Sequence, residues 1–535
     1  MTIPSHTDVL IVGAGPTGLM LGVQLARRGV RPLIVDRNPG PSVFSKALGV
    51  HARSLEIYSH LGIAERALEL GMRAAAADLW VEGRRAARVP LGDIGRDLSP
   101  YPFLLILAQD ENEQLLGEVL RDLGGDVSWN IELVDIEQRT DSASAVLRLA
   151  DGSTRTVEAR WIAGCDGPHS VVRELCGIDF PGAPYEHVFY VADTTVTGPM
   201  TPAELNVYLR RKGFQVFFPM PGQDRWRVVG ILPRELSNRD NLEFAAVAPS
   251  IIAQVGASLM FQECRWFSTY RIHHRRAERF RDRRCFLLGD AAHIHSPVGG
   301  QGMNTGLQDA YNLAWKLALV IEGRAGEALL DSYEAERLPN AIRLLRTTDR
   351  AFSFIVSSRW LTGSCRIRML GRAVALAMGR DHMRKSVFRT ISQIGIRYPA
   401  SFLSETPPGL PVGAPQAGDR FPWLHLRFSP AAPPEDLFER LDDTRFNLIM
   451  IGDSSLPAVP PELEGLLVTH RVPDDTPNDR EFERFRIPRP SFYLLRPDGH
   501  IGLVGVKLDA ALLRRYLSER LVLRKADTKG FISKS

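Results

Sequence analysis

Apolar and polar positions near the start of the chain predict a strand, a tight turn and a helix. "DVLIVGAGPTGLMLGVQLARRG", residues 8–29, begins with a short apolar run and continues with apolar residues at helical spacing. Three glycines, Gly13, Gly15 and Gly18, stand between the two. Gly13 permits the turn, Gly15 permits close approach of a pyrophosphate to the backbone, and Gly18 permits close packing of helix on strand. The pattern predicts a dinucleotide-binding turn.

The same order of an apolar run followed by an acidic residue returns three times. "PLIVD" ends at Asp36, "WIAGCDGPHSVVR" contains Asp166, and "CFLLGDAAH" contains Asp290. Ligands of open α/β sheets lie beyond the carboxyl ends of the strands, so we expect Asp36 to hold ribose hydroxyls and the other two acids to reach the same dinucleotide. The dinucleotide domain is therefore predicted to be discontinuous. The glycine turn and Asp36 alone leave FAD and NAD as alternatives, and the two further segments favour FAD.

A second glycine-rich segment follows Asp290. In "GDAAHIHSPVGGQGMNTGLQDAYNLAWKLALVI" the residues from Pro297 to Gly302 predict a loop, and those from Asn304 onward predict a helix with one apolar face. A loop that leads into a helix N-terminus stabilises negative charge. A reduced flavin carries such a charge at the N1–C2=O end of its ring. The alternative is a structural helix start whose glycines serve only the turn.

Between Asp166 and Asp290 the pattern changes to short runs of β-branched and aromatic residues with turn signals between them. "HVFYVADTTV", "LNVYLRRKGFQVFFPMP", "RWRVVGILP" and "CRWFSTYRIH" predict an antiparallel sheet inserted into the dinucleotide domain. Residues 351–403 have a helical pattern, for which a cover over the substrate region is favoured over a membrane-surface helix. The Pro- and Gly-rich "SETPPGLPVGAP" marks a linker at 404–415.

Composition excludes several other functions. The 535 residues are 44% hydrophobic and carry a formal charge of +4, so no nucleic-acid partner is expected. The apolar runs are too short for a membrane span, and a signal peptide has no room before the first run. Five cysteines without paired spacing predict a reducing, cytoplasmic location. His273, His274, His293 and His295 lack the spacing of a metal site, so no metal is expected.

The glycine turn at residues 8–29 and the segments that contain Asp166 and Asp290, in this order and at these separations, resemble single-component FAD-dependent aromatic hydroxylases of the para-hydroxybenzoate and phenol hydroxylase type. Asp166-Gly167 resembles the DG motif of that family and Gly289-Asp290 its GD motif. "LGVHARSLEIYSHLGI" resembles the segment whose arginine, here Arg53, faces the FAD pyrophosphate. "LLILAQDENEQLL" resembles the segment whose glutamine, here Gln109, contacts the ribityl or ribose region.

The resemblance implies an α/β fold: a Rossmann-like FAD-binding domain interleaved with an antiparallel-sheet substrate domain, followed by a thioredoxin-like domain. The implied boundaries are 1–180 and 271–350 for the FAD domain, 181–270 for the substrate sheet and 416–535 for the thioredoxin-like domain. That last domain has no CxxC, because the sequence holds no cysteine after Cys365. Pro490 is expected to be its cis-proline.

The predicted site residues follow from the motifs and the resemblance together. The cofactor-binding set is Gly13, Gly15, Pro16, Gly18, Asp36, Arg37, Arg53, Gln109, Asp166, Gly289, Asp290, Gly302, Met303 and Asn304. The residues expected at the reacting flavin ring are Pro297, Gly299 and Gly300. Phe217, Phe218, Pro219 and Met220 are candidates for the substrate pocket, with plain strand core as the alternative.

The implied reaction is hydroxylation of a phenolic ring through a flavin C4a-hydroperoxide, with NADPH or NADH as a transient reductant and O2 as oxidant. "RIHHRRAERFRDRR" is either a solvated helix or hairpin or a region that attracts the NADPH phosphates. The expected substrate is an aromatic polyketide or similar secondary metabolite. A small phenol such as a hydroxyphenylpropionate is the alternative, and a non-catalytic flavin-bound scaffold is a remote one. A halogenase is disfavoured because W-x-W-x-I-P is absent, and a monomer or homodimer is expected.

Overall fold

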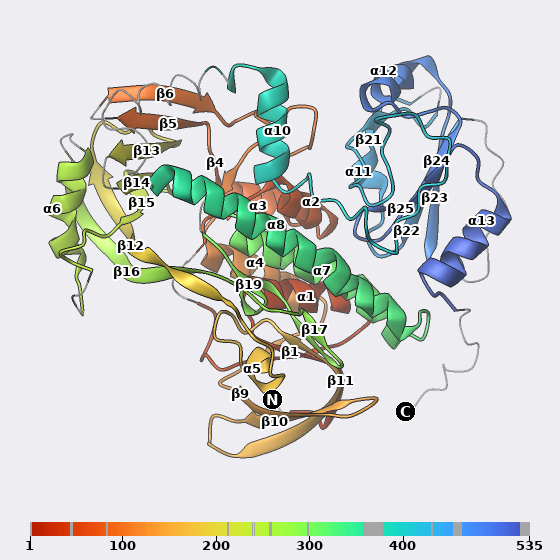
Figure 1. Ribbon diagram of the computed structural model, residues 1–535, viewed down its shortest axis with the longest axis horizontal. Helices are drawn as coiled ribbons and strands as arrows, with labels where there is room; N and C mark the ends of the chain where they lie inside the picture. The colour runs from red at the N-terminus through yellow and green to blue at the C-terminus, as the bar shows by residue number, and fades with distance from the viewer. Residues whose placement is uncertain are drawn as a thin grey trace.

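The computed structural model describes residues 3–42, 47–81, 84–210, 213–237, 239, 241–255, 259–296, 299–356, 376, 378–429, 432–452 and 463–524. Three main sheets make up the molecule (Figure 1). The first lies at the bottom of the view and the second at the left. The C-terminal sheet lies at the right, and the long helices α7 (Gly302–Ile321) and α8 (Asp331–Val356) cross the centre between them.

The first sheet is built around five parallel strands in the spatial order β8-β2-β1-β11-β18. Their bounds are β1 (His6–Val12), β2 (Leu33–Asp36), β8 (Val127–Trp129), β11 (Thr154–Gly164) and β18 (Cys285–Leu287). Antiparallel strands β9 (Glu132–Gln138), β10 (Ala143–Arg148) and β17 (Arg281–Asp282) complete it. The apolar runs are buried because helices cover the sheet, as is usual for parallel sheets.

Helices cover the first sheet and connect its strands. The turn after β1 leads into α1 (Pro16–Ala26), which packs against α4 (Gln109–Asp122) and α7. The remaining helices are α2 (Ala52–His60), α3 (Ala64–Leu70) and α5 (Val171–Leu175), with the 3₁₀ turns η1 (Gly289–Ala291) and η2 (Glu327–Leu330). A small sheet has the order β3 (Gly49–Val50), β7 (Leu105–Ile106), β4 (Met72–Arg73). The strand, turn and helix predicted at residues 8–29 are thereby confirmed.

The second sheet confirms the predicted antiparallel insertion and extends beyond it. Its order is β19-β16-β12-β15-β14-β13-β5-β6. The bounds are β5 (Ala76–Val81), β6 (Arg84–Pro90), β12 (Gly182–Thr197), β13 (Glu204–Arg210), β14 (Gly213–Pro219), β15 (Arg225–Ile231), β16 (Met260–Arg276) and β19 (His293–Ile294). Strands β5 and β6 were expected in the FAD domain, but β5 pairs in parallel with β13. Helix α6 (Phe244–Val255) covers one face of the sheet.

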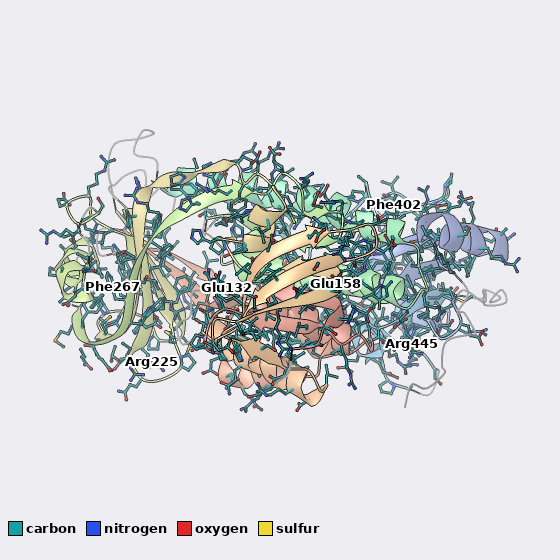
Figure 2. All side chains as sticks on the ribbon, turned by 90° about the horizontal axis from the view of Figure 1, so that it is seen from below. Glu132, Glu158, Arg225, Phe267, Phe402 and Arg445 are labelled. Atoms are coloured by element: carbon teal, nitrogen blue, oxygen red, sulfur yellow. The ribbon has the colours of Figure 1, made fainter. Side chains whose placement is uncertain are left out.

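Side chains of this second sheet and of the C-terminal part lie at opposite ends of the elongated molecule. Figure 2 shows Phe267 and Arg225 at one end and Arg445 at the other, with Glu132 and Glu158 of the first sheet between them. Of the predicted helical cover at 351–403, α10 (Asp381–Ile391) is described, whereas residues 357–375 and 377 lie outside the described residues. No helix among the described residues is long and apolar enough to cross a membrane.

The C-terminal sheet has the order β23-β22-β24-β25, in which β22 and β23 are parallel and the other neighbours antiparallel. Its elements are β22 (Phe446–Ile451), β23 (Leu467–Val472), α12 (Thr476–Phe485), β24 (Ser491–Leu495), β25 (Ile501–Gly505) and α13 (Ala510–Arg515), followed by a π-helical turn (Tyr516–Arg520). A small hairpin, β20 (His425–Leu426) with β21 (Glu435–Asp436), and α11 (Leu437–Arg440) precede it. The expected cis-proline is confirmed at Arg489-Pro490. The thioredoxin-like class of this unit stays a prediction.

Buried charges attach the C-terminal unit to α7 and α8. Arg496, which follows β24, contacts Glu336 of α8 at 2.5 Å, and Lys316 of α7 contacts the same carboxylate at 2.9 Å. Burial works to raise the pKa of Glu336, but the two cations outweigh it and lower the pKa to about 2. Glu405, in the predicted linker, also donates its backbone N–H to Gly502 of β25. The C-terminal unit is therefore fixed to the body of the molecule.

Candidate active site

The turn between β1 and α1 has the geometry that a dinucleotide pyrophosphate requires. Gly13 has φ +102°, and a Cβ there would lie 2.4 Å from the carbonyl oxygen of Cys165. A Cβ on Gly15 would meet nothing within 4 Å, so there is open space beside this backbone. Pro16 then begins α1, whose N-terminus has no side-chain cap. Uncapped N–H groups at a helix start are donors for a phosphate.

The strand ends that precede the predicted acids lie side by side. Val12 of β1 is the partner of Val35 of β2 and of Gly164 of β11, and Gly164 is in turn the partner of Leu287 of β18. The chain continues from these ends to Gly13, Asp36, Asp166 and Asp290. Segments near residues 13, 36, 166 and 290 therefore meet at one edge of the sheet.

Asp36 and Asp166 are held differently at this edge. Asp36 accepts a hydrogen bond from the backbone N–H of Ala14 at 2.7 Å, which ties the end of β2 to the glycine turn. The next residue, Arg37, is exposed. Asp166 accepts one from the N–H of Val172 at 3.2 Å, while its Oδ1 is enclosed without a hydrogen-bond partner among the described residues. Burial raises the pKa of Asp166. An enclosed acceptor atom at this edge fits a hydroxyl group of a bound ligand.

The predicted GD motif forms the tight turn η1. Gly289 has φ +58°, and a Cβ there would lie 2.7 Å from the Thr17 hydroxyl of α1, so the glycine permits both the turn and the close packing. Its backbone N–H donates to Asp309 of α7 at 3.0 Å. Asp290 itself is exposed beyond the strand end. Asp309, which the sequence did not single out, thus holds the turn of the GD motif in place through this hydrogen bond.

Asp309 is the centre of a buried charge cluster. Besides Gly289 it accepts hydrogen bonds from His293 at 2.8 Å and from the Arg337 guanidinium at 2.6 Å. Burial alone would raise its pKa, but Arg337 and His293 outweigh that effect and hold the pKa below the ordinary value. Arg337 also donates to the Tyr398 hydroxyl at 2.8 Å. The only sequence signal was an acidic residue within a helix predicted to have one apolar face.

The second glycine-rich loop is fixed by two more buried side chains. Gly299 and Gly300 have φ +86° and +63° and are exposed. His51 Nε2 donates to the Gly299 carbonyl at 2.7 Å, and burial lowers the His51 pKa to about 4, so the ring is neutral at neutral pH. Asn304 donates to the Gly300 carbonyl at 2.9 Å and accepts from the backbone N–H of His51 at 2.9 Å. Sequence reasoning passed over His51, two residues before Arg53.

The start of α7 completes this loop. Gly302 is the first residue of the helix, and no side-chain cap satisfies the helix N-terminus. Met303 is partly buried, and its sulfur accepts a hydrogen bond from Asn112 of α4 at 3.5 Å. Pro297 lies outside the described residues. The positive end of the dipole of this 20-residue helix therefore lies at the exposed glycine loop.

Arg53 and Gln109 have protein partners in this structure. Arg53 is buried and contacts Glu56 at 3.1 Å and the backbone carbonyl of Asp498, in the C-terminal unit, at 2.6 Å. The structure thus uses Arg53 to join α2 to the C-terminal unit, and gives no support to its expected contact with a pyrophosphate. Gln109 donates to Glu113 at 2.8 Å and accepts from the backbone N–H of Ala47 at 3.1 Å.

The four candidate pocket residues, three in β14 and Met220 directly after it, do not share one face. Phe217 is fully buried in the cluster under α6, where its ring contacts Tyr208 and Trp226. This placement favours the alternative of plain strand core for Phe217, whose side chain points to the opposite face from that of Phe218 because side chains alternate along a strand. Phe218 and Met220 lie in a separate apolar cluster with Leu48 and other residues of the first part of the chain. Pro219 is buried beside Trp226 in the β14–β15 pairing.

The arginine-rich stretch 271–284 is not a helix. It consists of the end of β16, a turn, and the β17–β18 hairpin. Arg281 contacts Asp331 at 2.5 Å and Arg284 contacts Glu327 at 2.9 Å. Among the described residues, no group of three or more His, Cys, Asp and Glu side chains is placed to hold a metal ion.

The residues at the sheet edge fit FAD. The open space beside Gly15, the uncapped start of α1 and the enclosed Asp166 Oδ1 match the groups of a dinucleotide. The exposed loop at Gly299–Gly300, which leads into the N-terminus of α7, matches the charged end of a reduced flavin ring.

Comparison with known proteins agrees with this geometry. A family model described as "FAD binding domain" matches residues 6–348. 6-Methylpretetramide 4-monooxygenase of Streptomyces rimosus is 31% identical over 555 residues, which cover 98% of this chain and 96% of the relative. Pentachlorophenol 4-monooxygenase of Sphingobium chlorophenolicum is 34% identical over 446 residues, covering 83% and 79%.

Solved structures extend the likeness to the fold. A ternary complex of aklavinone-11 hydroxylase with FAD and aklavinone superposes with a TM-score of 0.79 at 25% identity, covering 97% of this chain and 100% of that one. The mixed α/β fold and the FAD cofactor predicted from the sequence are thereby confirmed. The chain belongs to the FAD-binding-domain family, as an FAD-dependent monooxygenase of the aromatic hydroxylase type.

Proposed function

We propose that this enzyme uses NAD(P)H and O2 to hydroxylate the phenolic ring of an aromatic polyketide or a similar polycyclic secondary metabolite. The observation that carries the proposal is the end-to-end similarity to 6-methylpretetramide 4-monooxygenase, since the alignment covers nearly all of both chains. That coverage includes the second sheet and the C-terminal unit as well as the FAD-binding part.

The dinucleotide end of FAD is assigned to the edge of the first sheet. Backbone N–H groups at the start of α1 would bind the pyrophosphate beside Gly15. Asp36 would accept hydrogen bonds from ribose hydroxyls and keep its hydrogen bond from the backbone N–H of Ala14. Asp166 and Asp290 would hold hydroxyls of the ribityl chain. Bound FAD supplies the electrons and the activation of O2 for the reaction.

The ring end is assigned to the loop at Gly299–Gly302. Here the chain contributes the N-terminus of α7, which stabilises negative charge without a mobile side chain. His51 and Asn304 keep the loop in place by their hydrogen bonds to Gly299 and Gly300. His51 is neutral and already donates its Nε2 proton, so its task is to position the loop.

The substrate is assigned to the face of the second sheet that carries Phe218 and Met220. This face packs toward Leu48 and Ile106 of the FAD-binding part, whereas the opposite face is filled by α6. Apolar and aromatic side chains on this face would hold a flat polycyclic ring and exclude water from the reaction.

The proposal is tested by substrate-dependent oxidation of NADPH. Purified holoenzyme is incubated with a tetracyclic phenol of the pretetramide kind. NADPH consumption is measured by absorbance, and formation of a monohydroxylated product is measured by mass spectrometry. We expect product in proportion to NADPH consumed. Oxidation of NADPH that yields only hydrogen peroxide with every polycyclic phenol tested would contradict the assignment.

A small phenol is the second candidate. The observation in its favour is the likeness to pentachlorophenol 4-monooxygenase over 83% of the chain. The two candidates are separated by comparing kcat/KM for a tetracyclic phenol with that for a monocyclic one. A pocket built for a fused polycycle binds a single ring with less buried area, so the monocyclic phenol is expected to have the lower kcat/KM.

A further inference from the structure

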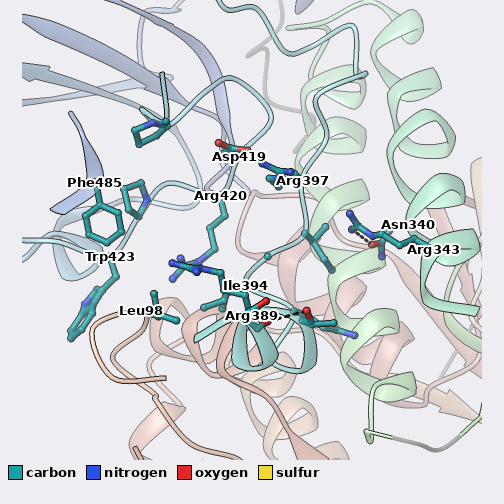
Figure 3. A pocket seen from close by; sticks show the side chains of 18 of the residues that line it. Leu98, Asn340, Arg343, Arg389, Ile394, Arg397, Asp419, Arg420, Trp423 and Phe485 are labelled. Atoms are coloured by element: carbon teal, nitrogen blue, oxygen red, sulfur yellow. Dashed lines mark hydrogen bonds and ion pairs between the residues drawn. The ribbon is translucent and has the colours of Figure 1, made fainter. Parts of the chain in front are cut away.

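A cavity of about 680 Å³ lies between α8, α10 and the C-terminal unit, beside the site described above. Figure 3 shows its wall, with Arg343 and Asn340 on one side and Trp423 and Phe485 on the other. Six arginines line it but only one acidic residue, Asp419. The arginines are Arg343, Arg389, Arg397, Arg420, Arg484 and Arg486. The lining is strongly basic in a protein whose total formal charge is only +4.

Three of these arginines are already paired with acids. Arg420 is bonded to the buried Glu56 at 2.9 Å, Arg484 lies 2.9 Å from Glu481, and Arg397 lies 3.7 Å from Asp419. The other three, Arg343, Arg389 and Arg486, form no ion pair with any described residue. Arg343 donates only to the neutral side chain of Asn340 at 2.8 Å. An anionic ligand would find several guanidinium groups that lack a counter-charge.

The end of the cavity at the C-terminal unit is aromatic. Trp423 donates its indole N–H to Asp436 at 2.7 Å, which fixes the ring, and Phe485 lies beside it in the wall. The guanidinium of Arg484 lies 4.5 Å from the centre of the Phe485 ring. Aromatic and guanidinium planes together are the groups on which a purine base stacks.

The cavity also reaches the loop assigned to the flavin ring. Gln301, immediately before α7, is part of its wall together with Gln393. Gln393 donates to the Gln301 carbonyl at 3.3 Å and to the Thr305 hydroxyl at 2.8 Å. A ligand held in the cavity would therefore lie next to the segment that carries Gly299 and Gly300.

We propose that this arginine cavity binds the ADP portion of the nicotinamide dinucleotide reductant, an inference that rests on the proposed function. The pyrophosphate is held by Arg343 and Arg389, because planar guanidinium groups bind phosphate oxygens in pairs. The adenine lies toward Trp423 and Phe485. The cavity volume falls within the range of about 300–1,000 Å³ that small-molecule sites occupy.

The arginine-rich stretch 271–284 provides a weaker alternative. Arg281, Arg283 and Arg284 line a hollow of about 500 Å³, but Arg281 and Arg284 already contact Asp331 and Glu327. Arg284 also donates to the backbone carbonyl of Thr140 at 2.8 Å. No aromatic residue is among the described residues that line this hollow. It offers a phosphate fewer available donors and an adenine no ring to stack on.

The test is anaerobic reduction of the bound FAD by NADPH. Stopped-flow absorbance monitors the reduction over a range of NADPH concentrations. The variant is Arg343→Gln with Arg389→Gln. The matched control is Arg346→Gln with Arg384→Gln, which changes an exposed and a half-buried arginine of the same two helices, neither of which lines the cavity. We expect the Kd for NADPH to rise by about tenfold or more in the variant, since each lost charge-assisted hydrogen bond is worth close to that factor. The control should keep the Kd, and both proteins should keep the FAD content.

Three further measurements fix the interpretation. Product formation after reduction by dithionite should be equal in variant and wild type, because it bypasses the nucleotide. Inorganic pyrophosphate should inhibit reduction of the wild type in competition with NADPH, and this test needs no variant to fold. Arg283→Gln should leave the Kd unchanged.

An unchanged Kd in the cavity variant, non-competitive pyrophosphate inhibition, or a raised Kd in Arg283→Gln would each overturn the site. Failure of both NADPH and NADH to reduce the wild type would instead overturn the proposed function.

Discussion

Replacing Asp309 by Asn removes the charge that anchors the GD turn. Asp309 is buried between the Gly289 N–H, His293 and Arg337, and Arg337 is itself buried, so the substitution leaves a guanidinium without its counter-charge. Breaking a buried pair in this way costs about 3–5 kcal/mol of the free energy of unfolding. The Gly289 N–H loses its charged acceptor at the same time, so FAD affinity should fall as well.

The measurement is urea unfolding at pH 7 together with FAD titration by fluorescence. The Asp309 pKa is lowered in the folded state, so its contribution is complete above the ordinary aspartate pKa and disappears only as the pH falls through the lowered value. The control is Asp331→Asn, whose carboxylate is exposed beside Arg281 and should cost less than about 1 kcal/mol. Equal losses for the two variants would refute the role given to Asp309.

Three other predictions follow from the same contacts. Gly13→Ala should lower the free energy of unfolding in urea by about 3 kcal/mol or more and abolish FAD binding. The reason is that a Cβ at φ +102° would lie 2.4 Å from the Cys165 carbonyl oxygen. Normal flavin content in this variant would exclude this geometry. The neutral, buried His51 has a pKa lowered to about 4, so stability should fall as the pH drops from the ordinary histidine value of about 6.5 toward 4, by about 1.4 kcal/mol per pH unit. His51→Gln should reduce that slope, and an identical slope would contradict the burial of an uncharged ring. Asp290→Ala should weaken FAD retention whereas Arg283→Gln should not, as measured by flavin content after gel filtration; full retention in Asp290→Ala would remove Asp290 from the site.

The local parts of the site were predictable from sequence. The apolar runs before the Gly13 turn and before the acids that follow β2, β11 and β18 each predict a strand from local sequence alone. The turn and the acids could therefore be placed at strand ends without knowledge of the rest of the chain. Their meeting at one edge was also predictable, because parallel strands present their carboxyl ends together.

What could not be predicted depends on tertiary contacts. The partner of Arg53 is 445 residues away, at Asp498, and no local pattern indicates that contact. Strand β5 joins the second sheet through parallel pairing with β13, which is decided by packing. The core position of Phe217 was one of the two alternatives from sequence, and strand alternation already places Phe217 and Phe218 on opposite faces.

Incorporation of isotopically labelled O2 tests the central claim most directly. Holoenzyme, NADPH and a tetracyclic phenol are incubated under labelled O2, and the product is analysed by mass spectrometry. A monooxygenase is expected to give a hydroxylated product whose new oxygen atom carries the label from O2. In labelled water with unlabelled O2, the new oxygen atom should carry no label. Label in water and hydrogen peroxide alone, or a new hydroxyl group that takes its oxygen from water, would contradict the central claim.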